Sequence, residues 1–451
     1  IPLFECPQHN FEEMYYYRWW SLRKHIKETP VGYGMTEFLV QRSYSDKYNL
    51  IACAIGHHIY ESRWLRDPKY LDQIIHTWYR GNDGGPMKKM DKFSSWNADA
   101  VLARYMVDGD KDYLLDMKKD LETEYQRWER TNRLKNGLYW QGDVQDGMEE
   151  SISGGRRKKY ARPTINSYMY GNAKALSCIG ILSGDEGMAM KYGMRADTLK
   201  NLVENELWNT RHQFFETMRT DSSANVREAI GYIPWYFNLP DTTQKYEIAW
   251  KEIMDEKGFS APYGLTTAER RHPEFRTRGV GKCEWDGAIW PFASAQTLTA
   301  MANFMNNYPQ TVLSDSVYFR QMELYVESQY HRGRPYIGEY LDEVTGYWLK
   351  GDQERSRYYN HSTFNDLIIT GLIGLRPRLD NTIEVNPLIP ADKWDWFCLD
   401  NVLYHGHNLT ILWDKNGDRY HCGKGLRIFV DGKEVGQANT LTKIVCENAL
   451  K

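Results

Sequence analysis

Two acidic segments in distant parts of the chain hold the groups best suited to do chemistry. Residues 145–151 (QDGMEES) contain Asp146 and Glu149, and residues 338–346 (GEYLDEVTG) contain Glu339. Each segment sets its carboxylates beside glycine in a polar loop between stretches with helical patterns. Hydrolysis of a glycosidic bond needs one carboxylic acid to protonate the leaving oxygen and a second carboxylate to activate water or attack the sugar. Two separate acidic loops fit that chemistry, although a chain with 60 Asp and Glu also places acidic clusters on its solvated surface.

Composition narrows the class of protein. The formal net charge of −3 supplies no basic field, so a nucleic-acid partner is not expected. Aromatic residues reach 14%, with 16 Trp and 32 Tyr, which modestly favours a carbohydrate ligand because such rings cover the apolar faces of sugars. Seven scattered cysteines form no CxxC pair, so no metal site and no cofactor are predicted. No apolar run is long enough to span a membrane. Because the chain starts at Ile1, we expect a processed N-terminus and a secreted or periplasmic protein. We also expect the protein to be a monomer.

The first 376 residues are dominated by apolar positions three or four apart, which is the helical period. An even number of helices can pair into six hairpins and close into a ring, an (α/α)6 toroid in which the loops at one end of the inner ring form a pocket. A helical bundle or an open solenoid is the alternative. The predicted helices are centred near Trp20, Ile55, Ile75, Leu102, Leu121, Ala175, Leu199, Trp235, Ile248, Leu298, Leu324 and Ile368.

The sequence pattern changes in residues 377–451 and predicts a small antiparallel β module. Residues 381–385, 409–413 and 426–430 are rich in strand formers. Asp431-Gly432 and Asn416-Gly417 are predicted hairpin turns. Because no flexible linker precedes this part, we expect it to pack on the helical domain of residues 1–376.

The acidic segments resemble blocks of the six-hairpin inverting glycosidases, the group of glycoside hydrolase family 63, the trehalases and the mannosylglycerate hydrolases. Residues 145–151 resemble a Glu-Ser-Gly-Trp-Asp-x-Ser block whose Asp is the general acid, and an ungapped alignment puts Glu149 at that position. Asp146 is the substitute acid. Residues 338–346 are similar to a late Glu-Tyr-x-x-Pro-x-Thr-Gly block, which implies that Glu339 is the general base.

Three further blocks extend the resemblance over most of residues 40–375. Residues 283–291 (CEWDGAIWP) are similar to a block that lines the family's sugar site, with Asp286 in place of the usual Arg. Asp46 lies where the family has a Trp-Asp loop, and Asn166 where it has an Asn at the start of a helix. Trp285 and Trp290 could equally be core residues. The substrate-binding residues implied by these blocks are Asp46, Asp146, Asn166, Trp285, Asp286 and Trp290.

These features together predict a glycoside hydrolase that acts in polysaccharide degradation. We expect it to be exo-acting and anomer-inverting, and to cleave a terminal, α-linked sugar from an oligosaccharide or glycan. Two other toroid enzymes stay open, an α-L-rhamnosidase-like enzyme and a polysaccharide-lyase-like one. A lyase would need arginines to neutralise a uronate, and the loops at 154–159 and 266–280 are rich in them. A non-catalytic glycan-binding protein is the rival outside the enzymes.

Overall fold

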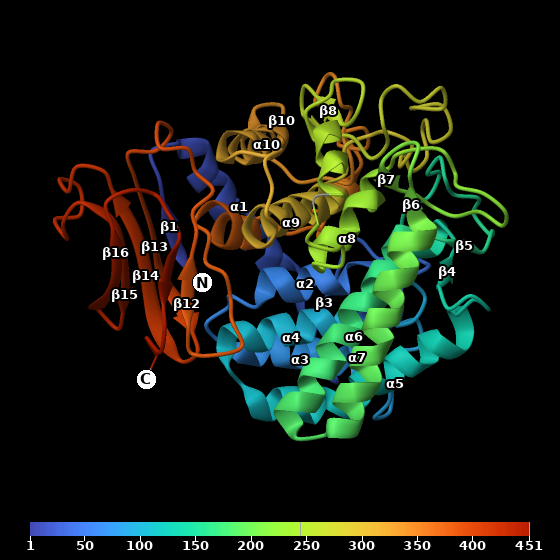
Figure 1. Ribbon diagram of the computed structural model, residues 1–451, viewed down its shortest axis with the longest axis horizontal. Coiled ribbons are helices and arrows are strands. Elements are labelled where there is room, and N and C mark those ends of the chain that lie inside the picture. Colours follow the sequence, from blue (N-terminus) through green and yellow to red (C-terminus); the bar gives the residue numbers. More distant parts are fainter. Residues whose placement is uncertain (244, 451) are drawn as a thin grey trace.

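The computed structural model describes residues 1–243 and 245–450 and is mainly helical (Figure 1). Every predicted helix centre lies in a helical segment. Ile248 lies in a 3₁₀ helix (Glu247–Ile253), and Ile368 begins a π-helical turn (Ile368–Leu372) that continues α11. The α-helices are α1 (His9–His25), α2 (Ile55–Ser62), α3 (Pro68–Arg80), α4 (Asn97–Asp108), α5 (Lys111–Asn132), α6 (Pro163–Ser183), α7 (Glu186–Leu202), α8 (Ile233–Tyr236), α9 (Pro291–Asn307), α10 (Asp315–Ser328) and α11 (Asn365–Leu367).

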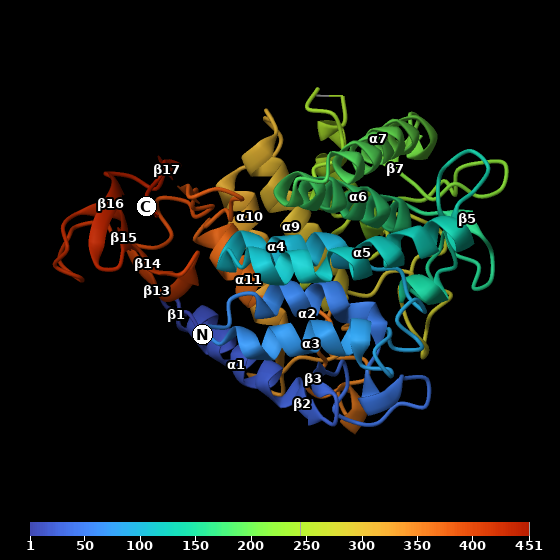
Figure 2. The ribbon, with the colours of Figure 1, turned by 90° about the horizontal axis from the view of Figure 1, so that it is seen from below.

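The helices form the predicted (α/α)6 toroid. Figure 2 shows α2 beside α3 and α4 beside α5, as hairpins of one inner and one outer helix. α6 carries apolar or small residues on every face, and all of its residues from Pro163 to Ala173 are buried, as an inner helix requires. Its partner α7 exposes one face, including Met190 and Met194. Gly184, in the left-handed region at φ 72°, ends α6, and the Asp185 side chain caps α7, so the two helices are joined by a tight turn.

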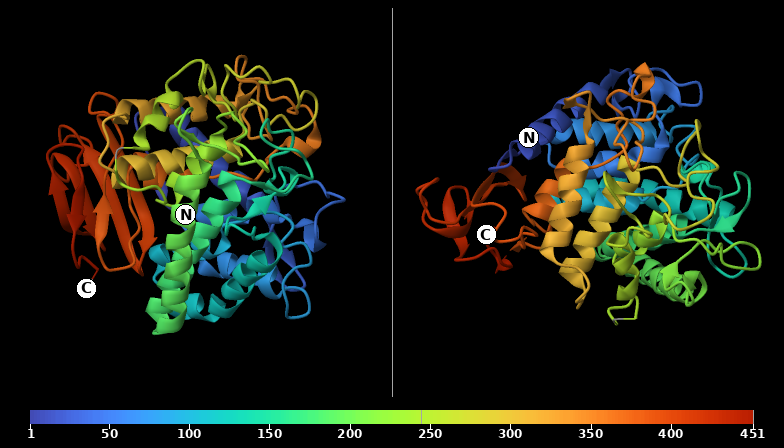
Figure 3. Two further views of the ribbon diagram at one scale, coloured as in Figure 1. Left: turned by 45° about the vertical axis from the view of Figure 1, so that its right-hand side comes forward. Right: turned by 90° about the horizontal axis from the view of Figure 1, so that it is seen from above.

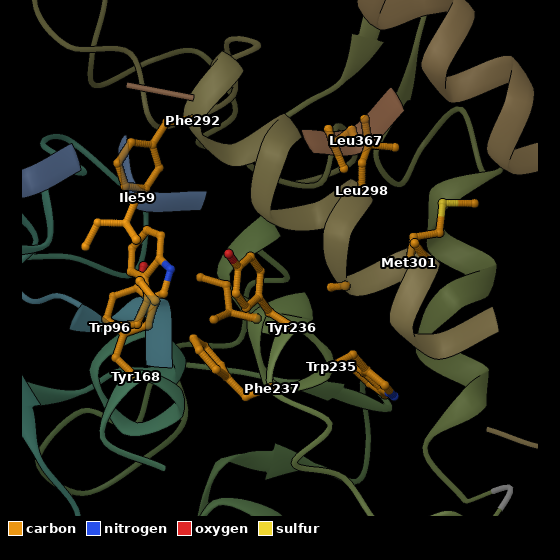
Figure 4. Packing of buried hydrophobic residues seen from close by; sticks show 14 of the residues in the cluster. Ile59, Trp96, Tyr168, Trp235, Tyr236, Phe237, Phe292, Leu298, Met301 and Leu367 are labelled. Carbon is orange, nitrogen blue, oxygen red and sulfur yellow. The ribbon is translucent and has the colours of Figure 1, made fainter. Parts of the chain in front are cut away.

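Aromatic side chains from several helices pack closely in the buried core (Figure 4). Trp96, just before α4, packs against Tyr168 of α6, with ring centroids 4.8 Å apart, and edge-on against Tyr236 of α8 at 5.9 Å. Phe292 at the start of α9 lies 6.3 Å from Trp96. These contacts join segments from four parts of the chain in the main hydrophobic core.

The chain ends in a five-stranded antiparallel sheet with the strand order β1-β13-β14-β15-β16. β12 (Ile383–Val385) pairs separately with β17 (Ile444–Cys446). Trp394 packs edge-on against Phe11 of α1 and Phe319 of α10, at 5.3 and 5.4 Å, so the segment that leads into the sheet shares the core of the helices. The strands of the sheet are β1 (Leu3–Glu5), β13 (Trp396–Tyr404), β14 (His407–Asp414), β15 (Gly425–Val430) and β16 (Lys433–Ala438).

Two details of the sheet differ from the sequence prediction. β1 comes from the N-terminus and pairs with β13, so the sheet combines both ends of the chain, and the boundary at residue 376 stays a prediction. The turn at Asp431-Gly432 is confirmed, because Val430 pairs with Lys433 and both turn residues have positive φ. Asn416-Gly417 does not form a tight hairpin. The connection runs from 415 to 424, because the Asp414 carboxylate accepts hydrogen bonds from the backbone N–H groups of residues 417, 419 and 420.

Five short two-stranded ribbons brace the loops between helices. The long loops around residues 150 and 270 gather on the side of the helices away from the five-stranded sheet (Figure 3). Within the two described ranges, no helix has both the length and the apolar character that a membrane crossing needs. The ribbons are β2 (Ile26–Thr29) with β3 (Gly32–Met35), β4 (Trp140–Gln141) with β5 (Tyr160–Ala161), β6 (Trp208–Asn209) with β7 (Phe214–Phe215), β8 (Ser260–Ala261) with β9 (Gly264–Leu265), and β10 (Tyr330–His331) with β11 (Arg334–Pro335).

Candidate active site

Three glutamates from distant segments come within electrostatic range of one another. The pKa of Glu149 is raised to about 7, mainly by burial and in smaller part by the charge on Glu339. The pKa of Glu37 is raised to about 8, mainly by burial and in smaller part by the charges on Glu339 and Glu149. The two segments singled out in the sequence therefore converge, and a third carboxyl group joins them. Clusters of acids with displaced pKa values are typical of catalytic sites.

Asp146 anchors the loop that carries Glu149 to neighbouring segments. The Asp146 side chain has no exposed surface and accepts a hydrogen bond from Arg162 Nε at 2.6 Å. The hydroxyl groups of Ser94 and Thr164 also donate to it. Both oxygens of Asp146 are thus engaged by the protein. Asp146 therefore acts as a positioning residue in this structure, and its contact with substrate or its use as the acid stays a prediction.

A glycine lets the Glu149 loop approach the inner helices. Gly147 ends a short 3₁₀ turn (Val144–Asp146) in the left-handed region at φ 73°. A Cβ atom at this position would collide with Cys53 Sγ, which only glycine avoids. Glu149 follows two residues later and is partly buried. The close approach explains why this acid is desolvated although it lies in a loop.

Glu339 lies in a cationic setting. Its Oε2 atom is 3.4 Å from Lys350 Nζ and 3.5 Å from Arg355 Nη2, and the residue is only 4% exposed. Two neighbouring cations stabilise negative charge on this carboxylate. The surrounding loop is held by backbone hydrogen bonds of 3.0 Å in both directions between Leu341 and Ile289. Glu149 and Glu339 therefore occupy opposite electrostatic environments within one site.

Trp285 and Trp290 form a continuous stack with Tyr340, the neighbour of Glu339. The ring centroids are 4.4 Å apart in the first pair and 4.6 Å apart in the second, with interplanar angles of 20° and 18°. Both tryptophans are buried, and Trp290 Nε1 donates to the Glu284 carbonyl at 3.2 Å. The stack fixes Tyr340 and with it the backbone of Glu339. That a tryptophan face covers the sugar ring stays a prediction.

The remaining predicted binding residues hold loops in place. Asp286 is fully buried, and its Oδ2 atom accepts from the backbone N–H groups of Arg278 at 2.6 Å and Gly279 at 2.9 Å. Asn166 is fully buried, and its side-chain amide bonds both backbone groups of Tyr139. Both residues are buried in this structure and hold the backbone of neighbouring segments, and their contacts with sugar hydroxyls stay a prediction.

Asp46 lies at the edge of the site and is 9% exposed. Its carboxylate accepts from the backbone N–H groups of Lys47 at 2.7 Å and Lys89 at 2.5 Å. It thereby joins the loop before α2 to the loop before α4. The next turn is strained, because Tyr48 and Asn49 both have φ near 60°. A contact of Asp46 with substrate stays a prediction.

Glu37 is the site residue that the sequence analysis missed. It follows β3, is 5% exposed, and lies 3.9 Å from His361 Nδ1. Its backbone carbonyl accepts from the Asn360 N–H at 2.9 Å, and a hydrogen bond from Tyr359 partly opposes the rise of its pKa. Burial holds the pKa of His361 well below its usual value, so this histidine is neutral. The only signal in the sequence was one acid inside the largely apolar run of residues 35–40 (MTEFLV).

We expect Glu37→Gln to stabilise the protein at alkaline pH. A buried carboxyl group whose folded pKa is about 8 favours folding fully below the unfolded pKa, and this contribution is lost as pH rises through about 8. One pKa unit corresponds to about 1.4 kcal/mol and the pKa of Glu37 rises from 4.5 to about 8, so the variant should gain up to about 5 kcal/mol at pH 9. Thermal unfolding at pH 5 and pH 9 measures this gain, which should vanish at pH 5. The exposed Glu206→Gln is the matched control, and an equal Tm change at both pH values for Glu37→Gln would contradict the prediction.

Comparison with family models assigns most of the chain. Residues 47–362 match the model of the mannosylglycerate hydrolase MGH1-like glycoside hydrolase domain, which includes Glu149 and Glu339. Residues 375–436 match the model of the glycosyl hydrolase family 65 C-terminal domain, from the strand β12 into β16. The catalytic candidates and the terminal sheet thus fall in two separate matches.

Solved structures with the same architecture extend this finding. A protein named sialidase is 95% identical over 100% of this chain with a TM-score of 0.99, and the chain spans 42% of its length. A GH63 mannosylglycerate hydrolase from Thermus thermophilus, in complex with glucose, is 13% identical over 79% of this chain and 99% of its own, with a TM-score of 0.57. A GH78 family rhamnosidase of Bacillus sp. GL1 is 11% identical over 95% of this chain and 41% of its own, with a TM-score of 0.63. The last two likenesses show the fold alone.

Proposed function

Because the chain belongs to the mannosylglycerate hydrolase MGH1-like glycoside hydrolase domain family, we propose that it hydrolyses a glycosidic bond with Glu149 as the acid and Glu339 as the base. The observation that carries this assignment is the contrast between the two carboxyl groups. Glu149 is desolvated and its pKa is raised to about 7, whereas Glu339 lies beside Lys350 and Arg355. A desolvated carboxyl group suits a proton donor, and a carboxylate beside two cations suits a base.

The proposed reaction is a single displacement. Protonated Glu149 gives its proton to the leaving oxygen while the Glu339 carboxylate takes a proton from a water molecule that attacks the opposite face of the sugar. Inversion needs about 6.5 to 9.5 Å between the two carboxyl groups, which leaves room for that water. Glu37, with a pKa of about 8, is neutral at pH 7 and can donate a hydrogen bond to the substrate or to the water.

The proposed substrate is an oligosaccharide or glycan with a terminal, α-linked sugar. The family match favours a mannoside, and the rhamnosidase likeness, which extends over the terminal sheet, keeps an α-L-rhamnoside as the second candidate. A sialoside is the third candidate substrate, because the protein named sialidase is 95% identical to this chain over the full length of this chain.

A panel of aryl glycosides and oligosaccharides tests the proposal. We expect the wild type to hydrolyse one class of α-glycoside, and proton NMR of the first product to show the inverted anomer. The double variant Glu149→Gln, Glu339→Gln is the control for contaminating activity. A wild-type protein that binds glycans and releases no sugar from any of them would favour the non-catalytic glycan-binding alternative. Retention of the anomer would contradict the roles given to the two glutamates.

A further inference from the structure

We propose that a groove beside α1 is a second, non-catalytic site that binds an acidic oligosaccharide. The groove measures about 980 Å³ and lies between α1 and the segments 331–336 and 351–358. None of the three clustered glutamates lines it. The choice of an oligosaccharide as the ligand rests on the proposed function, whereas binding in the groove needs no hydrolysis.

One wall of the groove is aromatic and exposed. Tyr16, Tyr17 and Trp20 follow one another on the outer face of α1, and Trp20 is 46% exposed. The Tyr358 ring meets Trp20 edge-on at 5.3 Å and lies 6.4 Å from Tyr17. Exposed aromatic groups gathered in a concave surface mark a binding site. Lys24 Nζ lies over one face of Trp20, 4.0 Å from the ring centroid, and adds a further cation to this wall. The remaining aromatic faces suit the C–H faces of sugar rings, while their polar atoms reach hydroxyl groups.

The other wall is cationic. Three arginines line it against one carboxylate, Asp352, which already accepts from Arg332 at 2.8 Å. Arg334 and Arg357 have no carboxylate within 4.0 Å among residues 1–243 and 245–450. A groove with this excess of positive charge complements an anion, and arginine binds carboxylate and sulfate through paired donors. The aromatic wall takes sugar faces and the arginines take acid groups, so the ligand is an acidic sugar chain.

The groove shares a loop with the candidate active site. Arg355 reaches Glu339 at 3.5 Å, while Arg357, two residues later, lines the groove. The backbone changes direction after Arg357, because Tyr358 adopts φ 60°, which is rare for an aromatic residue. His25 Nε2 lies 2.5 Å from the carbonyl oxygen of Tyr358 and holds this conformation. Tyr359, next along the chain, hydrogen-bonds with Glu37. A glycan held in the groove would therefore lie against the outer side of the loop that orders Glu339.

Calorimetric titration of the full chain with three defined hexasaccharides tests the site. The probes are hexagalacturonate, which is carboxylated, a heparin-derived hexasaccharide, which is sulfated, and neutral maltohexaose. We expect one or both acidic probes to bind and the neutral one not to bind. Trp20→Ala and Arg334→Ala should each weaken binding at least about 10-fold, because each removes one of the two recognition elements. Arg320→Ala, an arginine of α10 that is 52% exposed at its side chain, is the matched control and should bind as the wild type does.

The outcomes separate this inference from the proposed hydrolysis. Titrations in the Glu339→Gln background exclude turnover of the probe, and Trp20→Ala should leave hydrolysis of a small aryl glycoside unchanged. Binding that survives both substitutions, or equal binding of the neutral probe, would overturn the site. So would self-association of the wild type that Trp20→Ala abolishes in analytical ultracentrifugation, since the groove would then hold a second copy of the chain.

Discussion

Glu339→Gln lowers kcat by about 10² to 10⁴-fold and leaves the affinity for an unreactive ligand nearly unchanged. Glutamine keeps the shape of the side chain and one acceptor oxygen, but it cannot take a proton from water. Lys350 and Arg355, which lie 3.4 and 3.5 Å from the carboxylate, lose their counter-charge, and because Lys350 is buried the variant should also lose some stability. The loss of base function should show as a fall in kcat of the protein that remains folded.

Steady-state kinetics together with thermal unfolding check this expectation. Glu343→Gln is the matched control, because Glu343 belongs to the same loop, is buried to a similar degree, and pairs with Arg276 at 2.6 Å. Its replacement should reduce stability with little effect on kcat. If the Glu339 and Glu343 variants lose turnover equally, the effect belongs to the loop as a whole and the role of base is excluded.

Much of the toroid could be predicted because helix signals are local. The apolar period, the glycine that ends α6 and the aspartate that caps α7 are all written in short stretches of sequence. The pairing of β1 with β13 could not be predicted in this way. Three residues near the N-terminus have no local feature that identifies a partner nearly the whole chain away. Likewise Asn416-Gly417 has the composition of a tight turn, but Asp414 holds a longer loop through three backbone donors.

The candidate site was predicted in part for a similar reason. The sequence identifies acids in loops, and the structure brings Glu149 and Glu339 together. The sequence does not show which acids have carboxylate oxygens that accept hydrogen bonds from other segments. Asp146 accepts from Arg162, and one oxygen of Asp286 accepts from two backbone N–H groups, so both side chains hold protein segments in place. Glu37 has no motif at all, and only the folded chain places it beside the other two glutamates.

Glu149→Gln should slow hydrolysis strongly for poor leaving groups and weakly for good ones. An alkyl or sugar alcohol needs a proton to depart, so loss of the acid should cost about 10² to 10⁴-fold in kcat/KM. A dinitrophenolate departs without help and should lose far less. A base does not discriminate between leaving groups in this way, so the contrast assigns Glu149 as the acid and distinguishes it from Glu339.

The pH profile gives an independent test of the same assignment. The pKa of Glu149 is raised to about 7 because the carboxyl group is buried and lies near the charge of Glu339. Activity of the wild type on a poor leaving group should therefore fall as pH rises through about 7, when the acid loses its proton. This alkaline limb should disappear in Glu149→Gln and persist in Glu150→Gln, whose side chain pairs with Arg156 instead. An alkaline limb that survives in Glu149→Gln, or a rate loss independent of the leaving group, would assign the proton donor to another residue.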